Sequence, residues 1–387
     1  MPRLGIVGGD IVTEGGLLPH GALLLEDGKI VAVGLAREAV IPADTPVMDA
    51  AGRIVAPGYI DLHVHGAAGY DTMDATPEAL AAMARFFARH GVTSFLPTTV
   101  TASRAQTLAA IAAVADFQRR PPVGAQALGI HLEGPYINRA NLGAQNPEFA
   151  RSADPDEYPE FFRWGNVKLI SLAPEDPANL PLIPYAVAHG AAVAIGHSSA
   201  TYEEVMAAVE LGLTQATHTY NAMTGLHHRK PGATGAALTC DRIYAQIIVD
   251  LIHVHPAMVK LLVRAKGLGR TVLITDAMRA TGMADGTYDL GGQEVIVIHG
   301  EARLPAGNLA GSTLTMDRAV RNVRHAAELS TLEAICLATL TPAQSVGIAD
   351  RKGRIAPGCD ADLVILDQEL QVVATVVGGK ITYQADA

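Results

Sequence analysis

The chain has 387 residues, of which 49% are hydrophobic and 18% are charged, and this balance excludes a largely disordered protein. Its net charge of −10 argues against a nucleic-acid-binding surface, which needs clustered Lys and Arg, but a few local cations would still bind one small anion. No run reaches the roughly 18 uninterrupted apolar residues of a membrane helix, and the three cysteines lack CxxC spacing. With no signal-peptide pattern at the start, we expect a cytoplasmic protein that binds neither membrane nor nucleic acid.

Both ends of the chain predict β-strands. Residues 23–33 are two apolar runs around Asp27-Gly28, which is a strong hairpin signal. Residues 362–367 and 372–377 are strand-like runs followed by Gly378-Gly379. We therefore predict a small β-sandwich domain built from both termini, residues 1–56 and 345–387.

The middle of the chain alternates between apolar, β-branched runs and Ala-rich stretches, such as 77–90 and 202–211, that suit helices. This alternation is typical of parallel strands with helical crossovers. The runs lie near 59–65, 92–98, 127–133, 167–172, 191–196, 213–218, 244–250 and 271–275. Eight runs predict an α/β fold, a (β/α)8 TIM-type barrel over 57–344. A doubly wound open sheet is the alternative, although no GxGxxG follows the first run.

Ionisable residues stand at the ends of these runs, and in a barrel all of these ends face one rim. They are His63 and His65, Glu133, His197, His218, and Asp276. His63 and His65 are two residues apart, so both side chains point to one face of a strand. Imidazole and carboxylate are ligands that a divalent metal such as Zn²⁺ accepts. His131 shares the face of Glu133 one layer deeper, and Asp61 is interpreted as structural or as support for a ligand.

The His-Val-His pair, the single His residues after the fifth and sixth runs and the Asp after the eighth run resemble the amidohydrolase superfamily. A narrower set of motifs, in the same order along essentially the whole chain, resembles the N-acetylglucosamine-6-phosphate deacetylase family. These motifs are HLEGP (131–135), GHS (196–198), THTYNAM (217–223), RKPG (229–232), DLIHV (250–254), TDA (275–277) and LAGSTLTM (309–316). Many related enzymes have a carboxylated Lys where this chain has Glu133.

The resemblance implies a metal-dependent hydrolase that removes the N-acetyl group of N-acetylglucosamine 6-phosphate, giving glucosamine 6-phosphate and acetate in amino-sugar catabolism and cell-wall recycling. Glu133, His197 and His218 would hold the main divalent metal. His63 and His65 permit a second metal bridged by Glu133, with Asp276 as a further ligand. Zn is favoured over Fe, Mn and Co. A metal-bound hydroxide would be the nucleophile, and Asp276 the general base and then the acid.

The resemblance also implies substrate contacts. Asn221, Ala222, Arg229 and His253 match phosphate contacts, and Leu309 lies in a substrate-binding motif. Because the family's Arg reaches the neighbouring active site, we expect a homodimer. Gln145 stands where well-known members have a His that polarises the substrate carbonyl, so it is a candidate catalytic and substrate-binding residue. A purely structural hydrogen bond is the alternative for Gln145.

Three other functions stay open at this point. Another amidohydrolase acting on a cyclic amide or a different N-acyl substrate would not need the phosphate contacts Arg229 and His253. A non-catalytic relative should have lost metal ligands, and here all of them are present. A binding module for sugar phosphates would not need a general base such as Asp276.

Overall fold

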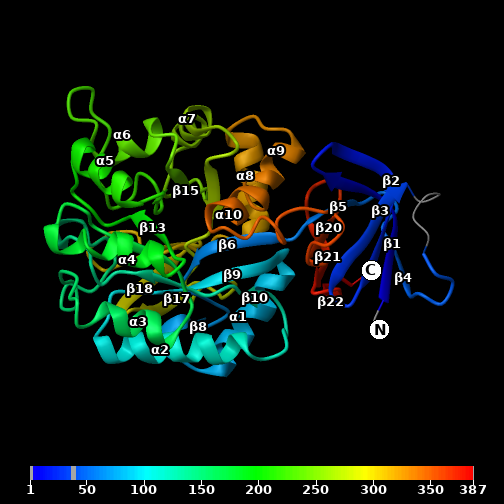
Figure 1. Ribbon diagram of the computed structural model, residues 1–387, viewed down its shortest axis with the longest axis horizontal. Helices are drawn as coiled ribbons and strands as arrows, with labels where there is room; N and C mark the ends of the chain where they lie inside the picture. The colour runs from blue at the N-terminus through cyan, green and yellow to red at the C-terminus, as the bar shows by residue number, and fades with distance from the viewer. Residues whose placement is uncertain (1–2, 36–40, 387) are drawn as a thin grey trace.

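The computed structural model describes residues 3–35 and 41–386, which form two bodies lying side by side (Figure 1). The larger body is a barrel surrounded by helices. The smaller body, on the right of the view, is a sheet that contains segments from both ends of the chain. None of the helices in the described ranges is long and apolar enough to cross a membrane.

The barrel consists of parallel strands in sequence order, so each is hydrogen-bonded to the strand before and after it. Its strands are β6 (Tyr59–Val64), β9 (Val92–Thr99), β11 (Ile130–Glu133), β12 (Val167–Leu172), β13 (Ala192–Ile195), β14 (Gln215–Ala216), β15 (Tyr244–Ile248) and β16 (Thr271–Ile274). The first and last strands meet where the N–H of Asp276 donates to the carbonyl of His63 over 2.9 Å. The predicted (β/α)8 barrel is confirmed.

The strands differ from the predicted runs in two places. The third run, 127–133, divides into β10 (Gln126–Ala127) and β11, with Gly129 at φ +156° between them. The sixth run, 213–218, contains only the two-residue strand β14, because the chain turns into the left-handed region at His218, where φ is 28°. His218 therefore sits on a loop that begins immediately after a short strand.

Helices cover the outside of the barrel, as Figure 1 shows. They are α1 (Pro77–Arg89), α2 (Arg104–Gln118), α3 (Tyr158–Trp164), α4 (Leu182–Ala188), α5 (Tyr202–Leu211), α6 (Gly232–Thr239), α7 (Pro256–Lys266), α8 (Met316–Ala326), α9 (Thr331–Cys336) and α10 (Leu340–Ser345). In α5, Thr201 and Glu204 form a capping box, and Gly212 ends the helix at φ +117°. The two helices predicted from sequence, at 77–90 and 202–211, are confirmed.

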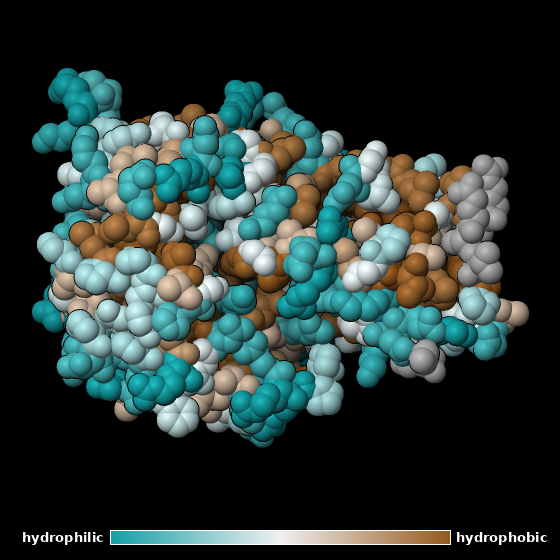
Figure 2. All heavy atoms as spheres, viewed as in Figure 1, coloured by the Kyte–Doolittle hydropathy of each residue, from teal (hydrophilic) through white to brown (hydrophobic). Residues whose placement is uncertain are grey.

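The smaller body is one hydrogen-bonded sheet with strands from both ends of the chain, as predicted. Its order is β22-β21-β20-β5-β1-β2-β3, with β4 paired to β1. The bounds are β1 (Arg3–Thr13), β2 (Gly16–Glu26), β3 (Lys29–Leu35), β4 (Val47–Asp49), β5 (Ile54–Pro57), β20 (Leu363–Leu366), β21 (Val372–Val377) and β22 (Lys380–Gln384). The Asp27-Gly28 hairpin joins β2 and β3. Figure 2 shows apolar side chains at the surface of this sheet, whereas hydrophilic side chains cover much of the barrel.

Two small antiparallel sheets lie outside the barrel, and the sequence did not predict either. β7 (Gly66–Ala67) pairs with β8 (Tyr70–Asp71), and β17 (Gly286–Leu290), β18 (Gln293–Ile298) and β19 (Glu301–Arg303) form a three-stranded sheet. Buried Val295 and Val297 of β18 pack with Val100 and Met278, so the three-stranded sheet is fixed close to the end of β16. We call residues 301–311, which return from β19 toward α8, the rim hairpin.

Candidate metal centre and active site

Six ionisable side chains meet at the carboxyl ends of the barrel strands. His63 and Glu133 lie in β6 and β11, and the other four follow their strands by one or two residues: His65, His197, His218 and Asp276. All six residues are at most 7% exposed. The barrel therefore brings together residues up to 213 positions apart, from His63 to Asp276.

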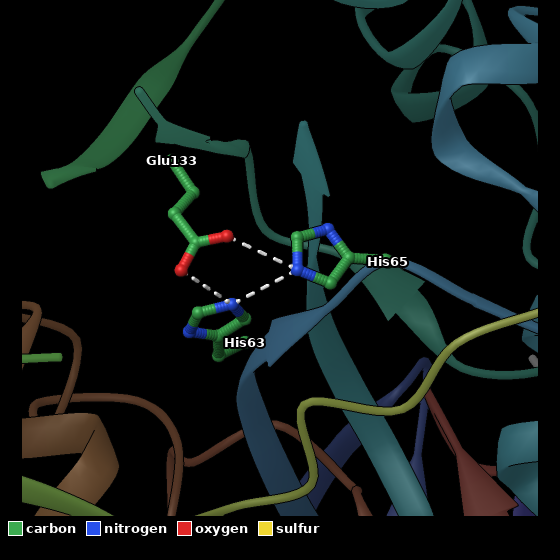
Figure 3. Close-up of side chains that lie close together, drawn as sticks. All are labelled: His63, His65 and Glu133. Carbon is green, nitrogen blue, oxygen red and sulfur yellow. Dashed lines mark hydrogen bonds and ion pairs between the residues drawn. The ribbon is translucent and has the colours of Figure 1, made fainter. Parts of the chain in front are cut away.

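Glu133 lies at the centre of this cluster. Its Oε1 is 3.1 Å from Nε2 of His197 and 3.0 Å from Nε2 of His218, and these two nitrogens are 3.1 Å apart. On the other side, Nε2 of His63 is 3.4 Å from Oε1, and Nε2 of His65 is 3.2 Å from Oε2. Figure 3 shows Glu133 facing both of these imidazoles, whose nitrogens are 3.2 Å apart. Glu133 thus belongs to both groups of potential metal ligands.

The chemistry of these atoms fits a divalent metal. Imidazole nitrogens this close to each other are disfavoured when both carry a proton or both present a lone pair, and a cation between them removes the conflict. The opposite ring nitrogens of two histidines face backbone carbonyls: Nδ1 of His197 is 2.9 Å from the carbonyl of Asn141, and Nδ1 of His65 is 3.3 Å from that of Thr98. A proton on Nδ1 leaves Nε2 free to bind a metal. The structure thus provides a site for one or two divalent ions.

The carboxylates of this cluster are kept ionised. Burial alone would raise the pKa of Glu133, but the charges of His63 and His197 and the hydrogen bonds to His197 and His218 together hold the pKa well below its usual range. Burial would also raise the pKa of Asp276, and the charge of His63 with the hydrogen bond to His65 lowers it to about 2. Asp276 Oδ1 is 3.5 Å from Nε2 of His63 and 3.3 Å from Nε2 of His65. Both carboxylates therefore carry negative charge at neutral pH.

Three of these residues adopt a backbone conformation that favours glycine. The φ angles are +49° at His197, +28° at His218 and +51° at Asp276. Each such residue costs roughly 1–2 kcal/mol. A glycine would avoid this cost, so the sequence retains these side chains at the expense of stability, which is typical of a functional site.

Gln145 is buried beside the cluster, and its amide orientation is fixed. Its Oε1 accepts a hydrogen bond of 2.6 Å from the N–H of Thr101, so its Nε2 faces Glu133 and donates to Oε2 over 2.6 Å. This geometry favours the alternative in which Gln145 makes a structural hydrogen bond, because its amide holds the carboxylate of Glu133, a predicted metal ligand, in position. Its contact with a substrate carbonyl stays a prediction, which the second N–H of the amide permits.

Five of the six cluster residues, all except His63, line a cavity of about 350 Å³. The lining includes most of the predicted substrate contacts, namely Asn221, Ala222, His253, Leu309 and Gln145. The His253 ring is oriented by Asp250, whose Oδ2 is 2.6 Å from Nδ1. Burial lowers the pKa of His253, but the hydrogen bond and charge of Asp250, together with the charge of Asp276, outweigh burial and raise the pKa.

Arg229 is the predicted contact that the chain does not bring to its own cavity. It is exposed on the loop before α6, and its Nη1 is 2.7 Å from Nε2 of His228. Conversely, Arg303 and Asn308 of the rim hairpin line the cavity, although the sequence interpretation did not select them. The LAGSTLTM motif beginning at Leu309 was the nearest available signal.

Comparisons with known proteins agree with this geometry. Residues 54–382 match the model of the amidohydrolase family. The chain is 40% identical to an N-acetylgalactosamine-6-phosphate deacetylase of Escherichia coli O157:H7, over 96% of this chain and 97% of that protein. It is 38% identical to an N-acetylglucosamine-6-phosphate deacetylase of Lysinibacillus sphaericus, over 94% of this chain and 93% of that protein.

Solved structures of such enzymes share the whole fold. The Thermotoga maritima N-acetylglucosamine-6-phosphate deacetylase superposes with a TM-score of 0.90 at 34% identity, covering 98% of this chain and 100% of that one. An aspartate-to-alanine mutant of the Mycobacterium smegmatis enzyme, in complex with N-acetyl-D-glucosamine-6-phosphate, gives 0.92 at 32% identity, covering 99% and 100%. The chain therefore belongs to the amidohydrolase family and, within it, to the N-acetylglucosamine-6-phosphate deacetylases.

Proposed function

We propose that this protein hydrolyses the N-acetyl group of N-acetylglucosamine 6-phosphate, consuming one water and releasing acetate and glucosamine 6-phosphate, in amino-sugar catabolism and cell-wall recycling. The observation that carries the proposal is one cavity that joins the Glu133 cluster and Asp276 to a set of anion-binding groups, Asn221, Ala222 and His253. A cytoplasmic location is supported by Cys240, Cys336 and Cys359, which are all unpaired.

Glu133, His197 and His218 would hold the main metal, with Zn²⁺ favoured, and His63, His65 and Asp276 would complete a second site with Glu133. When bound, the metal supplies Lewis acidity that activates water and stabilises negative charge on the amide oxygen. Asp276 lines the cavity, and its ionised carboxylate lies beside the ligand histidines, with Oδ1 3.3 Å from Nε2 of His65. It can therefore take a proton from the attacking water and deliver it to the amide nitrogen, since an amine leaves poorly unless protonated.

The distant phosphate orients the amide for this reaction. His253 directs Nδ1 to Asp250, which leaves Nε2 for the phosphate, and Asn221 and Ala222 line the same cavity. Binding energy from a group far from the reacting bond positions that bond. A substrate without phosphate should therefore react poorly.

A homodimer would bring Arg229 to the phosphate of the neighbouring active site. Two features support this part of the proposal: Arg229 is exposed and outside its own cavity, and Leu226, three residues earlier, is 52% exposed. An exposed apolar side chain next to an exposed Arg suits a contact between subunits. Sedimentation should give twice the chain mass, and inactive Arg229→Gln mixed with inactive Asp276→Asn should regain part of the activity through hybrid dimers. A monomer that is fully active would contradict the dimer.

The direct test is acetate release from N-acetylglucosamine 6-phosphate, with N-acetylglucosamine alongside. We expect fast release from the phosphorylated sugar alone, and loss of release on chelation. N-acetylgalactosamine 6-phosphate is the second candidate substrate, since the E. coli relative is named for it. The ratio of kcat/KM for the two phosphorylated sugars identifies the preferred one. No release from either, with metal bound, would refute the proposal.

A further inference from the structure

The rim hairpin brings one permanent cation to the cavity. Arg303 is the sole Arg or Lys among the cavity-lining residues of the described chain. Its side chain is 45% exposed, whereas that of Glu133, which lines the same cavity, is 1% exposed. Arg303 therefore lies toward the mouth of the cavity, away from the atoms that would react.

The hairpin fixes the position of Arg303 on the same cavity as the anion-binding groups. Its backbone pairs with Leu309, and the N–H of Leu304 donates to the carbonyl of Asn308 over 2.9 Å, which closes a tight turn. The far side of the hairpin is anchored where the Asn308 amide donates to the carbonyl of Gly143. The positive charge of Arg303 reaches His253, since it adds to the effect of burial in lowering the pKa of that histidine, against the larger opposing effect of Asp250.

The guanidinium of Arg303 is paired with the carboxylate of Glu301 in this structure. Its Nε donates to Oε1 of Glu301, and its Nη1 donates to the carbonyl of Gly307 over 2.5 Å. Glu301 is itself 35% exposed, so this ion pair is worth little and exchanges readily for another anion. A guanidinium has more N–H groups than these two acceptors use, and its planar fork matches phosphate oxygens.

We propose that Arg303 binds the substrate's phosphate from within the same chain, and that Glu301 restrains Arg303 until the phosphate replaces it. This inference rests on the proposed function and adds a specificity-determining residue to it. Arg303 would act together with His253 and independently of Arg229, which the proposed dimer supplies from the neighbouring subunit. A role limited to shaping the hairpin is the competing explanation.

The two explanations predict different signs for two substitutions. Arg303→Gln should raise KM for N-acetylglucosamine 6-phosphate about tenfold with kcat within about twofold, because it removes binding that ground state and transition state share. Glu301→Gln should lower this KM about threefold, because it frees Arg303. Neither should change kcat/KM for N-acetylglucosamine. Arg303→Lys should recover part of the lost affinity, since it keeps the charge but not the fork.

The chain offers a matched control pair. Arg242 also binds one glutamate, Glu210, over 2.7 Å and one backbone carbonyl, that of Val209, over 2.7 Å, but it lies outside the cavity lining. Arg242→Gln and Glu210→Gln should therefore leave KM unchanged. Calorimetric titration with glucosamine 6-phosphate and with inorganic phosphate gives a binding readout that needs no turnover, and weaker binding to Arg303→Gln is expected.

The possible results test the role of Arg303 separately from the proposed deacetylase activity. An active wild-type enzyme with an unchanged KM in Arg303→Gln would refute the inference and leave the function standing. The inference would also be refuted if Arg303→Gln and Glu301→Gln both raised KM or both lowered it, or if they changed kcat/KM equally for N-acetylglucosamine 6-phosphate and N-acetylglucosamine. A wild-type enzyme that releases no acetate would refute the function, and phosphate binding measured by calorimetry would still decide the role of Arg303.

Discussion

Replacing Asp276 by Asn should remove proton transfer while preserving the shape of the site. The side chain is 10% exposed, lines the cavity, and contacts the imidazoles of His63 and His65 at 3.5 and 3.3 Å. Asn has the same size as Asp, but its amide cannot accept a proton at neutral pH. General acid–base catalysis contributes about 10²–10⁴ in rate, so we expect kcat to fall about 10³-fold, which corresponds to about 4 kcal/mol in the barrier.

Three measurements on the Asp276→Asn variant separate this role from others. Acetate release gives kcat, elemental analysis gives metal content, and calorimetry gives the affinity for N-acetylglucosamine 6-phosphate. We expect metal at the Glu133, His197 and His218 site and substrate affinity to be retained. The exposed α2 residue Asp116 provides the control, and Asp116→Asn should have wild-type kcat. A kcat within tenfold of wild type would refute the general-base assignment. Loss of metal together with activity would show that the main role of Asp276 is to bind metal rather than to transfer protons.

Three further predictions concern metal binding and stability. Glu133→Gln removes the carboxylate that four imidazoles face within 3.4 Å, so elemental analysis should find metal reduced at least tenfold and added Zn²⁺ should no longer raise the melting temperature. The pKa of Asp317 is lowered from 3.8 to about 2 by His90 and Arg321, against burial. Because this ionised carboxylate stabilises the fold, the Asp317→Asn variant should be about 2 kcal/mol less stable than wild type in urea unfolding at pH 7. Because the folded-state pKa is depressed, that difference should shrink as pH falls from about 4 toward 2, and a constant difference would contradict it. Lys352→Met leaves the buried Asp362 without its cation and should cost about 3 kcal/mol in urea unfolding, which Lys352→Met combined with Asp362→Leu should partly restore.

The barrel was predictable because its strands are buried on both faces. Strands such as β13 and β16 have no exposed residue, and they appear in the sequence as the nearly uninterrupted apolar runs AVAI and TVLI. The polar residues that interrupt this pattern occur where each strand ends, and parallel topology brings these ends to one rim. Local chemistry was equally informative for the β2–β3 hairpin, where Asp27 and Gly28 have the positive φ angles, +50° and +79°, that the turn needs.

The three-stranded sheet could not be predicted in the same way. β18 alternates between buried and exposed residues because one of its faces packs on Val100 and Met278, which are distant in sequence. The sheet matters for the cavity because it carries Arg303, which lines the cavity together with His253, although the two residues are 50 positions apart in sequence. Contacts of this kind follow from how an insertion folds back on the barrel, and no local pattern encodes them.

Gln145 shows why residue type alone left two roles open. A glutamine in this loop has both a donor and an acceptor, so the sequence permits contact with a substrate carbonyl or with the protein itself. The choice depends on the N–H of Thr101, a backbone group 44 residues earlier, because that donor takes the amide oxygen and directs the amide nitrogen to Glu133. Where the family resemblance predicts a His, this chain has a neutral amide whose orientation the N–H of Thr101 determines. Oε1 of Glu133 then faces His197 and His218 while Oε2 is shared between Gln145 and His65, and this arrangement would suit a carboxylate that takes part in both predicted metal sites.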